Sequence, residues 1–197
     1  MRMKKVGLLT LGLFLLFAAC KKSKKTPDEP VVPSETEAAQ PEIPDSTLWG
    51  HLGEDTGMST LQFITDAGDT LEIYRTSQYT GKDGCLIGEV RNYTDRFAVT
   101  LTEGNETLVT AINMTQLIQQ WYAKNGSMTI KGDGTITSDD MPYNGWKLWN
   151  GHFLLSSEQR QEYGMVSRID TMDIIWLDND SLIIRDHINQ IQAFSTK

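Results

Sequence analysis

Short stretches in which apolar and polar residues alternate recur along residues 47–197, and turn-forming residues separate them. Alternation with a period of two is typical of a strand that buries one face. Three pairs of such stretches flank short turns: "STLQFIT" with "DTLEIYRT", "RFAVTLT" with "ETLVTAI", and "SMTIKG" with "GTITS". The pattern predicts antiparallel hairpins and an all-β body.

The clearest turn signal is Asn150-Gly151 in the stretch "WKLWNGHFLL". Asn-Gly favours a two-residue type I′ turn, because both central residues need positive φ. Such a turn pairs Trp149 with His152, and the register of every residue further along the hairpin follows from that pair. Since side chains alternate between faces, one face is predicted to enter the core. It holds Trp146, Leu148, Phe153 and Leu155.

A second hairpin is predicted in "IIWLDNDSLII", with its turn at Asn179-Asp180. Counting outward from that turn brings four apolar residues to one face of the hairpin. They are Ile175, Leu177, Leu182 and Ile184.

One stretch, "NMTQLIQQWYAKNG", predicts a short helix rather than a strand. Asn113 is suited to cap it, Gln116 lies three residues later, and Asn125-Gly126 supplies a stop signal. Leu117, Ile118 and Trp121 would share one face of this helix. The helix divides the body into a first part with five or six short strands and a second part with six to eight.

The motifs "GSMTIKGDGTITS", "YNGWKLWNGHFLL" and "DTMDIIWLDNDSLIIRD", after a helix with a tryptophan, resemble the lipocalin-like domain of many bacterial lipoproteins. The resemblance covers roughly residues 113–187 and implies an antiparallel meander that forms a barrel or half-barrel. The preceding residues resemble the small β module that often stands before that domain. The expected fold class is therefore all-β, with two small antiparallel β modules and one short helix between them.

The N-terminus predicts a lipid anchor. A basic start and a short apolar run over residues 1–19 indicate a cleaved signal peptide. The ending "FAAC" resembles the lipobox of bacterial lipoproteins, in which Cys20 would be acylated and become the first mature residue. An ordinary secretory signal, with Cys20 incidental, is the alternative. By the same resemblance we expect an outer-membrane lipoprotein of the cell envelope, on the periplasmic face, with the membrane as a partner through acylated Cys20.

Residues 20–45 contain five of the six prolines and few large apolar residues. Such a segment buries too little apolar surface to offset its ordering entropy, which predicts a disordered tether after the lipidated cysteine. The remaining chain divides into the predicted small β module, residues 46–112, and the predicted lipocalin-like module, residues 113–197.

Charge excludes one class of partner. The whole chain has a formal net charge of −8, and residues 46–197 carry eleven Lys and Arg against twenty Asp and Glu, a net charge of −9. An acidic body repels phosphate backbones, so no nucleic-acid partner is expected. With Cys20 acylated, Cys85 has no cysteine left to pair with, and we expect it to be buried and inert.

Candidate chemistry is sparse. The histidines His51, His152 and His187 show no metal-ligand spacing, and no nucleophile or phosphate-loop motif occurs. His152 is expected on the outer face beside the hairpin turn. The acids of "DD" at 139–140 and of "DND" at 178–180 suit turns, with a weak calcium site as the alternative. We expect no catalytic residues, no metal site and no cofactor.

Aromatic residues of the second module leave two functions open, and the sequence does not identify ligand-binding residues. In the first, the protein is a non-catalytic binding protein that takes a small apolar or sugar-like ligand through the barrel. In the second, the barrel is filled, and a structural or interaction lipoprotein presents a sheet edge or an exposed aromatic such as Trp149 to an envelope protein. The aromatics concerned are Trp121, Tyr143, Trp146, Trp149, Tyr163 and Trp176.

Replacing the acylated cysteine tests the anchor. Cys20→Ser should abolish incorporation of labelled palmitate and release or mislocalise the protein, because the hydroxyl does not substitute for the lipidated thiol. The measurement is fatty-acid labelling followed by fractionation of the envelope. Wild-type labelling of the Ser variant would contradict the lipoprotein interpretation.

Overall fold

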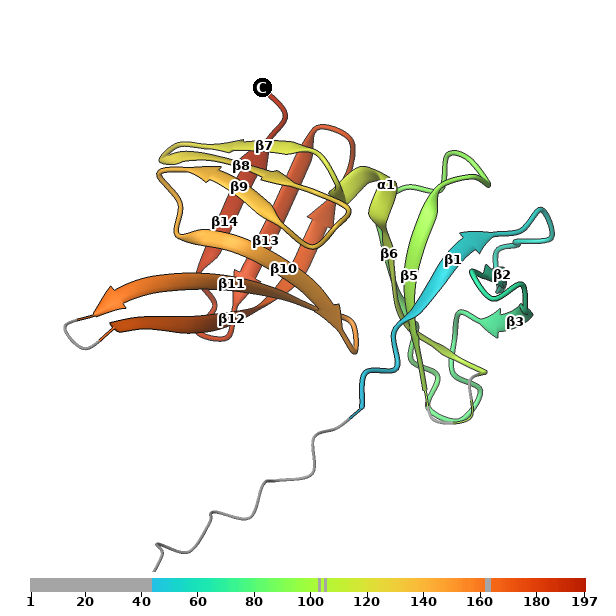
Figure 1. Ribbon diagram of the computed structural model, residues 1–197. Helices are drawn as coiled ribbons and strands as arrows, with labels where there is room; N and C mark the ends of the chain where they lie inside the picture. The colour runs from blue at the N-terminus through green and yellow to red at the C-terminus, as the bar shows by residue number, and fades with distance from the viewer. Residues whose placement is uncertain (1–43, 103, 105, 162–163) are drawn as a thin grey trace, which may run out of the picture. The chain divides into compact units, whose positions relative to one another are not determined.

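The computed structural model describes residues 44–102, 104, 106–161 and 164–197. The predicted signal peptide, Cys20 and the tether up to residue 43 lie outside the described residues, as does Tyr163. The described fold is nearly all strand with one short helix, and its strands form two sheets (Figure 1). The predicted all-β class is confirmed. The division into modules after residue 112 stays a prediction. Along the sequence, the last strand of the first sheet ends at Asn113 and the first strand of the second sheet begins at Gln120.

The first sheet has six strands in the order β3-β2-β1-β5-β6-β4. Neighbouring strands are antiparallel except β4, which runs parallel to β6 and forms an edge of only three residues. The strands are β1 (Leu48–Leu52), β2 (Thr60–Thr65), β3 (Thr70–Tyr74), β4 (Cys85–Ile87), β5 (Arg96–Leu101) and β6 (Leu108–Asn113).

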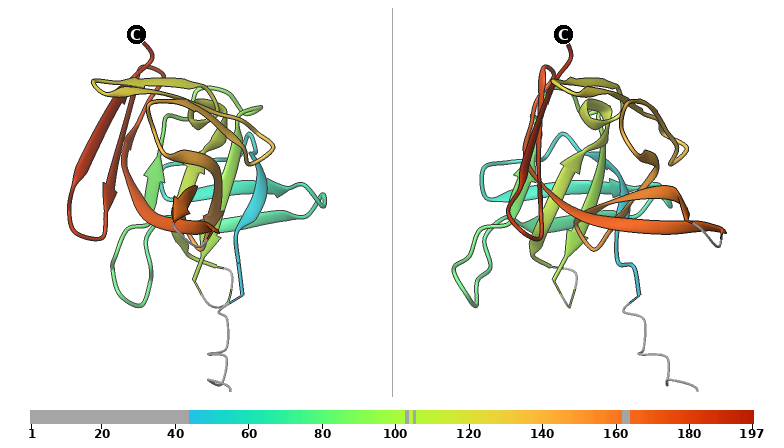
Figure 2. Two further views of the ribbon diagram at one scale, coloured as in Figure 1. Left: turned by 60° about the vertical axis from the view of Figure 1, so that its left-hand side comes forward. Right: turned by 90° about the vertical axis from the view of Figure 1, so that its left-hand side faces the viewer.

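The second sheet has eight antiparallel strands in the order β10-β11-β12-β13-β14-β7-β8-β9. It curls into a nearly closed barrel, as the views of Figure 2 show. An isolated bridge between Thr135, the residue before β9, and Gly145 of β10 spans the seam, and the backbone N–H of Trp146 donates to the Gly134 carbonyl across it (2.8 Å). The strands are β7 (Gln120–Ala123), β8 (Gly126–Ile130), β9 (Ile136–Asp139), β10 (Tyr143–Trp149), β11 (His152–Gln161), β12 (Gly164–Leu177), β13 (Ser181–Asp186) and β14 (Ile191–Ser195).

The predicted helix is much shorter than its pattern indicated. Helix α1 spans Met114–Leu117, and Asn113 caps it as predicted by accepting a hydrogen bond from the Gln116 N–H (3.2 Å). Trp121 does not lie on the helix but on strand β7, and the predicted stop at Asn125-Gly126 is the turn between β7 and β8. The prediction relied on the four-residue spacing of Leu117 and Trp121, which fits one face of a helix. It was wrong because the pairing of β7 with β8 and β14 outweighs the weak helix propensity of this stretch.

The hairpin of β10 and β11 has the predicted register. Trp149 pairs with His152 and Trp146 with Leu155, and the turn residues Asn150 and Gly151 have φ values of 49° and 83°. The four residues of the predicted inner face are all buried. The turn also lies against β6, since a Cβ at Gly151 would come within 3.1 Å of the Thr110 hydroxyl oxygen.

The hairpin of β12 and β13 turns where predicted, but one of its inner residues is different. Ile174 pairs with Ile184 and Trp176 with Ile183, so Ile175 is an extra residue in a β-bulge. The bulge leaves Ile175 exposed and buries Ile174 in its place. The prediction failed at this residue because a bulge reverses the alternation on one side of it, which counting from the turn does not detect.

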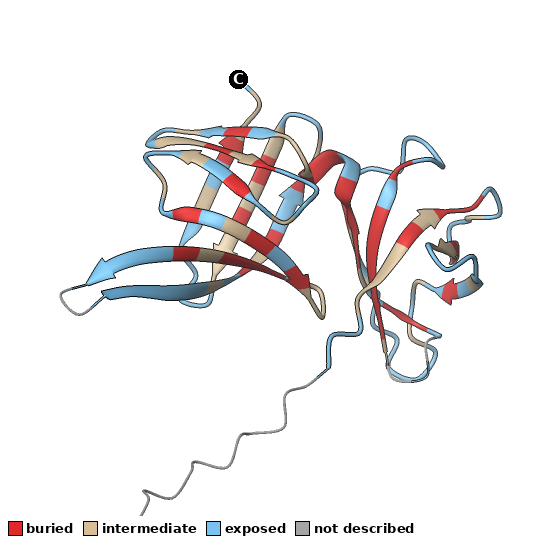
Figure 3. Ribbon diagram, viewed as in Figure 1, coloured by how far each residue is buried: buried red, intermediate tan, exposed pale blue. Residues whose placement is uncertain are grey.

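The apolar core follows the two sheets (Figure 3). A smaller cluster, with Phe63 and Phe97, lies within the first sheet. The larger cluster fills the barrel and continues through Met114 of α1 to Ile87, Ala98 and Ile112 of the first sheet. The barrel therefore packs against the first sheet through one continuous apolar contact.

Large-to-small changes on the β10–β11 hairpin test its register. Trp146→Ala and Phe153→Ala should each lower the free energy of unfolding by about 3–5 kcal/mol, because both side chains fill the core. Lys147→Ala on the outer face should change it by no more than about 0.5 kcal/mol. Denaturant unfolding measures all three, and equal damage at Lys147 and Trp146 would indicate a register shifted by one residue.

Candidate functional site

The interior of the barrel is filled by its own side chains. Trp121 and Phe153 have no accessible surface, and the same holds for Met128, Leu155, Leu182 and Ile184. A side chain with no accessible surface adjoins no space that a water molecule could enter. No ligand cavity therefore lies against these residues inside the barrel.

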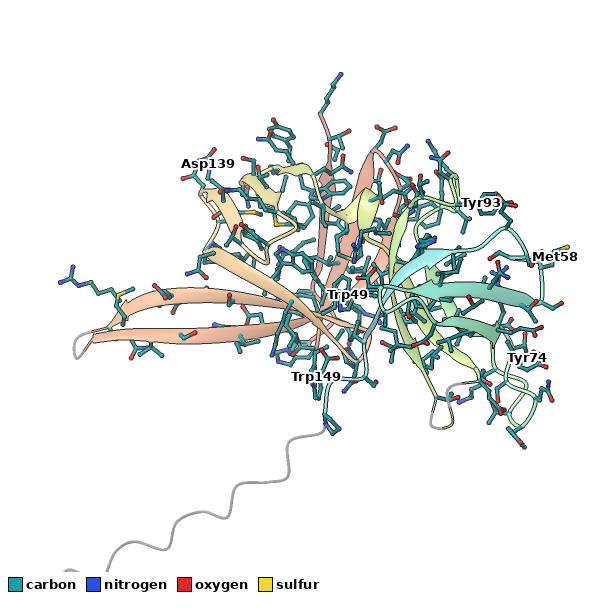
Figure 4. All side chains as sticks on the ribbon, turned by 45° about the vertical axis from the view of Figure 1, so that its right-hand side comes forward. Trp49, Met58, Tyr74, Tyr93, Asp139 and Trp149 are labelled. Carbon is teal, nitrogen blue, oxygen red and sulfur yellow. The ribbon has the colours of Figure 1, made fainter. Side chains whose placement is uncertain are left out.

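The aromatic residues that the sequence singled out separate into two groups. Trp121, Tyr143 and Trp146 are buried, and both buried indoles donate to backbone carbonyls, those of Leu117 (2.9 Å) and Lys131 (2.8 Å). Burial raises the pKa of the Tyr143 hydroxyl, partly offset by a hydrogen bond with Gln192. Trp149 is half-buried at the end of β10 (Figure 4), and Trp176 is 57% exposed. The described aromatics thus fill the core or face outward, and they do not gather around a cavity.

The strongest candidate site is an opening of about 340 Å³, here called the intersheet cleft. It lies between β4 and β6 of the first sheet and the turn and outer face of the barrel. Its lining residues are Cys85, Ile87, Val109, Thr110, Asn150, Gly151, His152, Asp173, Ile174, Ile175 and Arg185.

Three polar side chains form a row in the intersheet cleft. Asp173 of β12 contacts His152 of β11 through Oδ1 (3.2 Å to Nδ1) and Arg185 of β13 through Oδ2 (3.2 Å to Nη2). The three strands are consecutive neighbours, and Asp173 and Arg185 are direct cross-strand partners. Each of these side chains keeps 40–48% of its surface exposed, so the row remains open to a ligand.

Aliphatic side chains form the other side of the intersheet cleft. Ile87 and Val109 come from the first sheet, whereas Ile174 and Ile175 come from β12. Three consecutive residues of β12, Asp173 to Ile175, line the cleft, and the β-bulge is the reason that Ile175 is exposed there while Ile174 stays in the core. The bulge was the feature that pattern counting missed.

The rim of the intersheet cleft is held by the last two residues of the predicted tether, Pro44 and Asp45, and by Ser46, so these two tether residues are ordered by contacts with the turn. The Ser46 N–H and hydroxyl both donate to Asn150 Oδ1 (2.9 and 2.7 Å), and Asn150 Nδ2 donates to the Pro44 carbonyl (3.2 Å). Asp45 accepts from the Asn150 N–H (3.3 Å). Desolvation would raise the pKa of Asp45, but hydrogen bonds from Thr47 and Asn150 outweigh it and lower the pKa. These contacts fasten residues 44–46 to the turn.

Cys85 lines the intersheet cleft and is exposed, so the prediction that it is buried was wrong. It begins β4, whose outer edge has no neighbouring strand in the first sheet. The prediction relied on the usual burial of free cysteine, and nothing in the sequence marked this short strand as an edge.

The remaining predicted site residues do not come together. His152 is exposed on the outer face, as predicted, and is separate from His51, which lines another opening of about 470 Å³ beside the β1–β2 loop. Asp178 accepts from the Trp176 indole (2.8 Å) and from the N–H groups of Asp180 and Ser181, and these hydrogen bonds lower its pKa. That geometry is a turn, as the sequence predicted.

Residues 44–102, 104, 106–161 and 164–197 contain no group of three or more His, Cys, Asp or Glu residues placed to hold a metal ion. A helix with the length and apolar composition that a membrane span requires does not occur among them either. Asp139, one of the acids with a calcium alternative, lies apart from Trp149 in Figure 4.

Comparison with known proteins supports the fold assignment of the barrel. Residues 123–197 match the family model described as lipocalin-like. Among solved structures, the chain is similar to a lipocalin-like protein from Bacteroides thetaiotaomicron VPI-5482, with 19% identity, coverage of 41% of this chain and 96% of that chain, and a TM-score of 0.35. The comparison with curated proteins finds no match. The predicted lipocalin-like resemblance is confirmed for residues 123–197, whereas the character of the small β module and the lipid anchor stay predictions.

The exposure of Cys85 can be measured directly. We expect iodoacetamide to modify Cys85 in the native protein at a rate close to that of the unfolded chain, because the thiol lies at an open edge. Mass spectrometry of the modified peptide follows the reaction, and Cys85→Ser supplies the blank. A thiol that reacts only after denaturant is added would contradict the observed edge position.

Proposed function

We propose that this chain is a lipid-anchored, non-catalytic binding protein of the cell envelope that takes a small apolar or sugar-like ligand in the intersheet cleft. The observation that carries the proposal is the row of His152, Asp173 and Arg185, which faces aliphatic side chains across an opening of about 340 Å³. Small-ligand sites combine apolar walls with a few convergent polar groups in this way. The lipocalin-like match of residues 123–197 supports a binding role by family resemblance.

The filled interior shifts the proposed site from the inside of the barrel to its outer surface. Ligand binding at the centre would require Trp121 and Phe153 to move, and both are fully buried. Protein interiors are close-packed, so opening such a space costs several kcal/mol of lost contacts, about 3–5 for each large side chain. The intersheet cleft requires no comparable rearrangement.

A non-catalytic role is supported by the openness of the cleft. Reactions that use charged side chains benefit from sites that exclude water. His152, Asp173 and Arg185 instead keep nearly half of their surface in contact with solvent. Such a row is better suited to reversible hydrogen bonding than to proton transfer.

The anchor remains part of the proposal. Acylated Cys20 would attach the chain to the outer membrane, on the periplasmic face, and residues 20–45 would tether the body. The support is the "FAAC" motif and the proline-rich composition of the sequence. Residues 44–46 reach the rim of the intersheet cleft, so the tether would join the body beside the site.

A second candidate function is a docking role for an envelope protein. The outer face of β12, β13 and β14 carries Trp176 (57% exposed) and Ile191 (66% exposed), with Ile183 between their strands. Exposed apolar side chains on neighbouring strands can mark interaction sites. This face and the filled barrel together favour the interaction alternative over a ligand inside the barrel.

Native mass spectrometry distinguishes the two functions. The full chain purified from its own envelope should carry a small molecule in addition to its acyl chains. Val109→Trp should abolish binding of the small molecule, because the larger side chain would fill the intersheet cleft. Val166→Trp is the matched control, since Val166 lies on β12 outside the cleft and is exposed to a similar extent. A wild-type protein without added mass that crosslinks to an envelope protein through Trp176 would instead support the docking role.

A further inference from the structure

We infer that the intersheet cleft selects a neutral saccharide over charged or wholly apolar ligands. This inference rests on the proposed function, because it specifies the chemistry of the ligand at the same site. It follows from three properties of the cleft: its balanced charge, its unused hydrogen-bonding capacity and its aliphatic wall.

Balanced charge disfavours ions. The cleft contains one carboxylate, that of Asp173, and one guanidinium, that of Arg185, in direct contact (3.2 Å). An anionic ligand attracted to Arg185 would lie beside Asp173, and a cationic ligand attracted to Asp173 would lie beside Arg185. The net charge of −9 on residues 46–197 further disfavours anions. A neutral ligand meets neither repulsion.

The polar row has donors and acceptors to spare. A carboxylate offers about four acceptor positions and a guanidinium five N–H donors, whereas the contacts among the described residues use one position on each Asp173 oxygen and one nitrogen of Arg185. The Nε2 atom of His152 makes no hydrogen bond to a described residue. Adjacent donors and acceptors match neighbouring hydroxyl groups, each of which can donate and accept.

The aliphatic wall excludes a ligand that is polar on every side, and the polar row excludes one that is wholly apolar. An apolar molecule would remove water from Asp173, His152 and Arg185 without replacing its hydrogen bonds, which is unfavourable. A sugar ring presents C–H groups on its face and hydroxyls at its edge, so it can contact Ile175 and Val109 while bonding to the row. The volume of about 340 Å³ is at the small end of ligand pockets and suits one or two rings.

Saturation-transfer NMR on the full chain tests this inference. The protein is held in lauryldimethylamine oxide, because a sugar-based detergent would occupy the cleft. The probes are glucose, galactose, mannose, N-acetylglucosamine and disaccharides of these, with glucuronate as the anionic and glucosamine as the cationic comparison. We expect saturation transfer to the ring C–H groups of at least one neutral sugar, and weaker or no transfer to the charged sugars.

Variants locate the binding. Asp173→Asn and Arg185→Gln should each weaken binding of the neutral sugar by about tenfold or more, as expected for loss of a hydrogen bond to a charged group. Arg168→Gln is the control, since Arg168 forms a comparable ion pair with Asp170 on β12 outside the cleft. Thermal unfolding of each variant, compared with wild type, separates loss of binding from loss of fold.

Three results would overturn the inference. The first is tighter binding of glucuronate or glucosamine that depends on Asp173, and the second is binding of a neutral sugar that neither cleft variant affects. The third is no binding of any sugar while native mass spectrometry still shows a molecule that Val109→Trp excludes; in that case the proposed function stands and the ligand class is wrong. If no small molecule is found by either method, the proposed function fails together with the inference.

Discussion

Close packing inside the barrel constrains everything else in this structure. Trp121 and Phe153 have no accessible surface, and the apolar cluster to which they belong extends through Met114 to Ile87 and Ile112 of the first sheet. Because the core is continuous, the first sheet packs directly against apolar residues of the barrel core. The interior leaves no room for a ligand, and the line where the two sheets meet becomes the place where backbone edges, polar side chains and aliphatic surface converge.

The parts of the fold that depend on local signals could be predicted from the sequence. Asn150-Gly151 determined a register that the structure reproduces from Trp149 to Trp146, because turn type and alternation specify the same pairing. Trp121 was misplaced because its four-residue spacing from Leu117 also fits a helix, and only the pairing of β7 with strands distant in sequence decides the matter. Ile175 was misplaced because one extra residue reverses the side on which it lies.

The candidate site was harder to predict than the fold. His152 could be placed on the outer face from its hairpin, but its neighbours Asp173 and Arg185 come from two further strands, whose alignment depends on the bulge. Cys85 and Val109 line the same cleft from the first sheet. The alternation of apolar and polar residues within one sheet does not specify how that sheet packs against another. The chemistry therefore arises from tertiary contacts among residues that are individually unremarkable in the sequence.

The fastening of Ser46 to Asn150 has a mechanical consequence. If Cys20 anchors the chain as proposed, a pull from the membrane would enter the body at residues 44–46 and then pass into β1, which lies between β2 and β5. Tension along a central strand loads its hydrogen bonds in shear, so that they share the force instead of opening one by one. The contacts of Asn150 with Pro44 and Asp45 would yield first, followed by those with Ser46, so tension on the tether would loosen the turn at the rim before it threatened the fold.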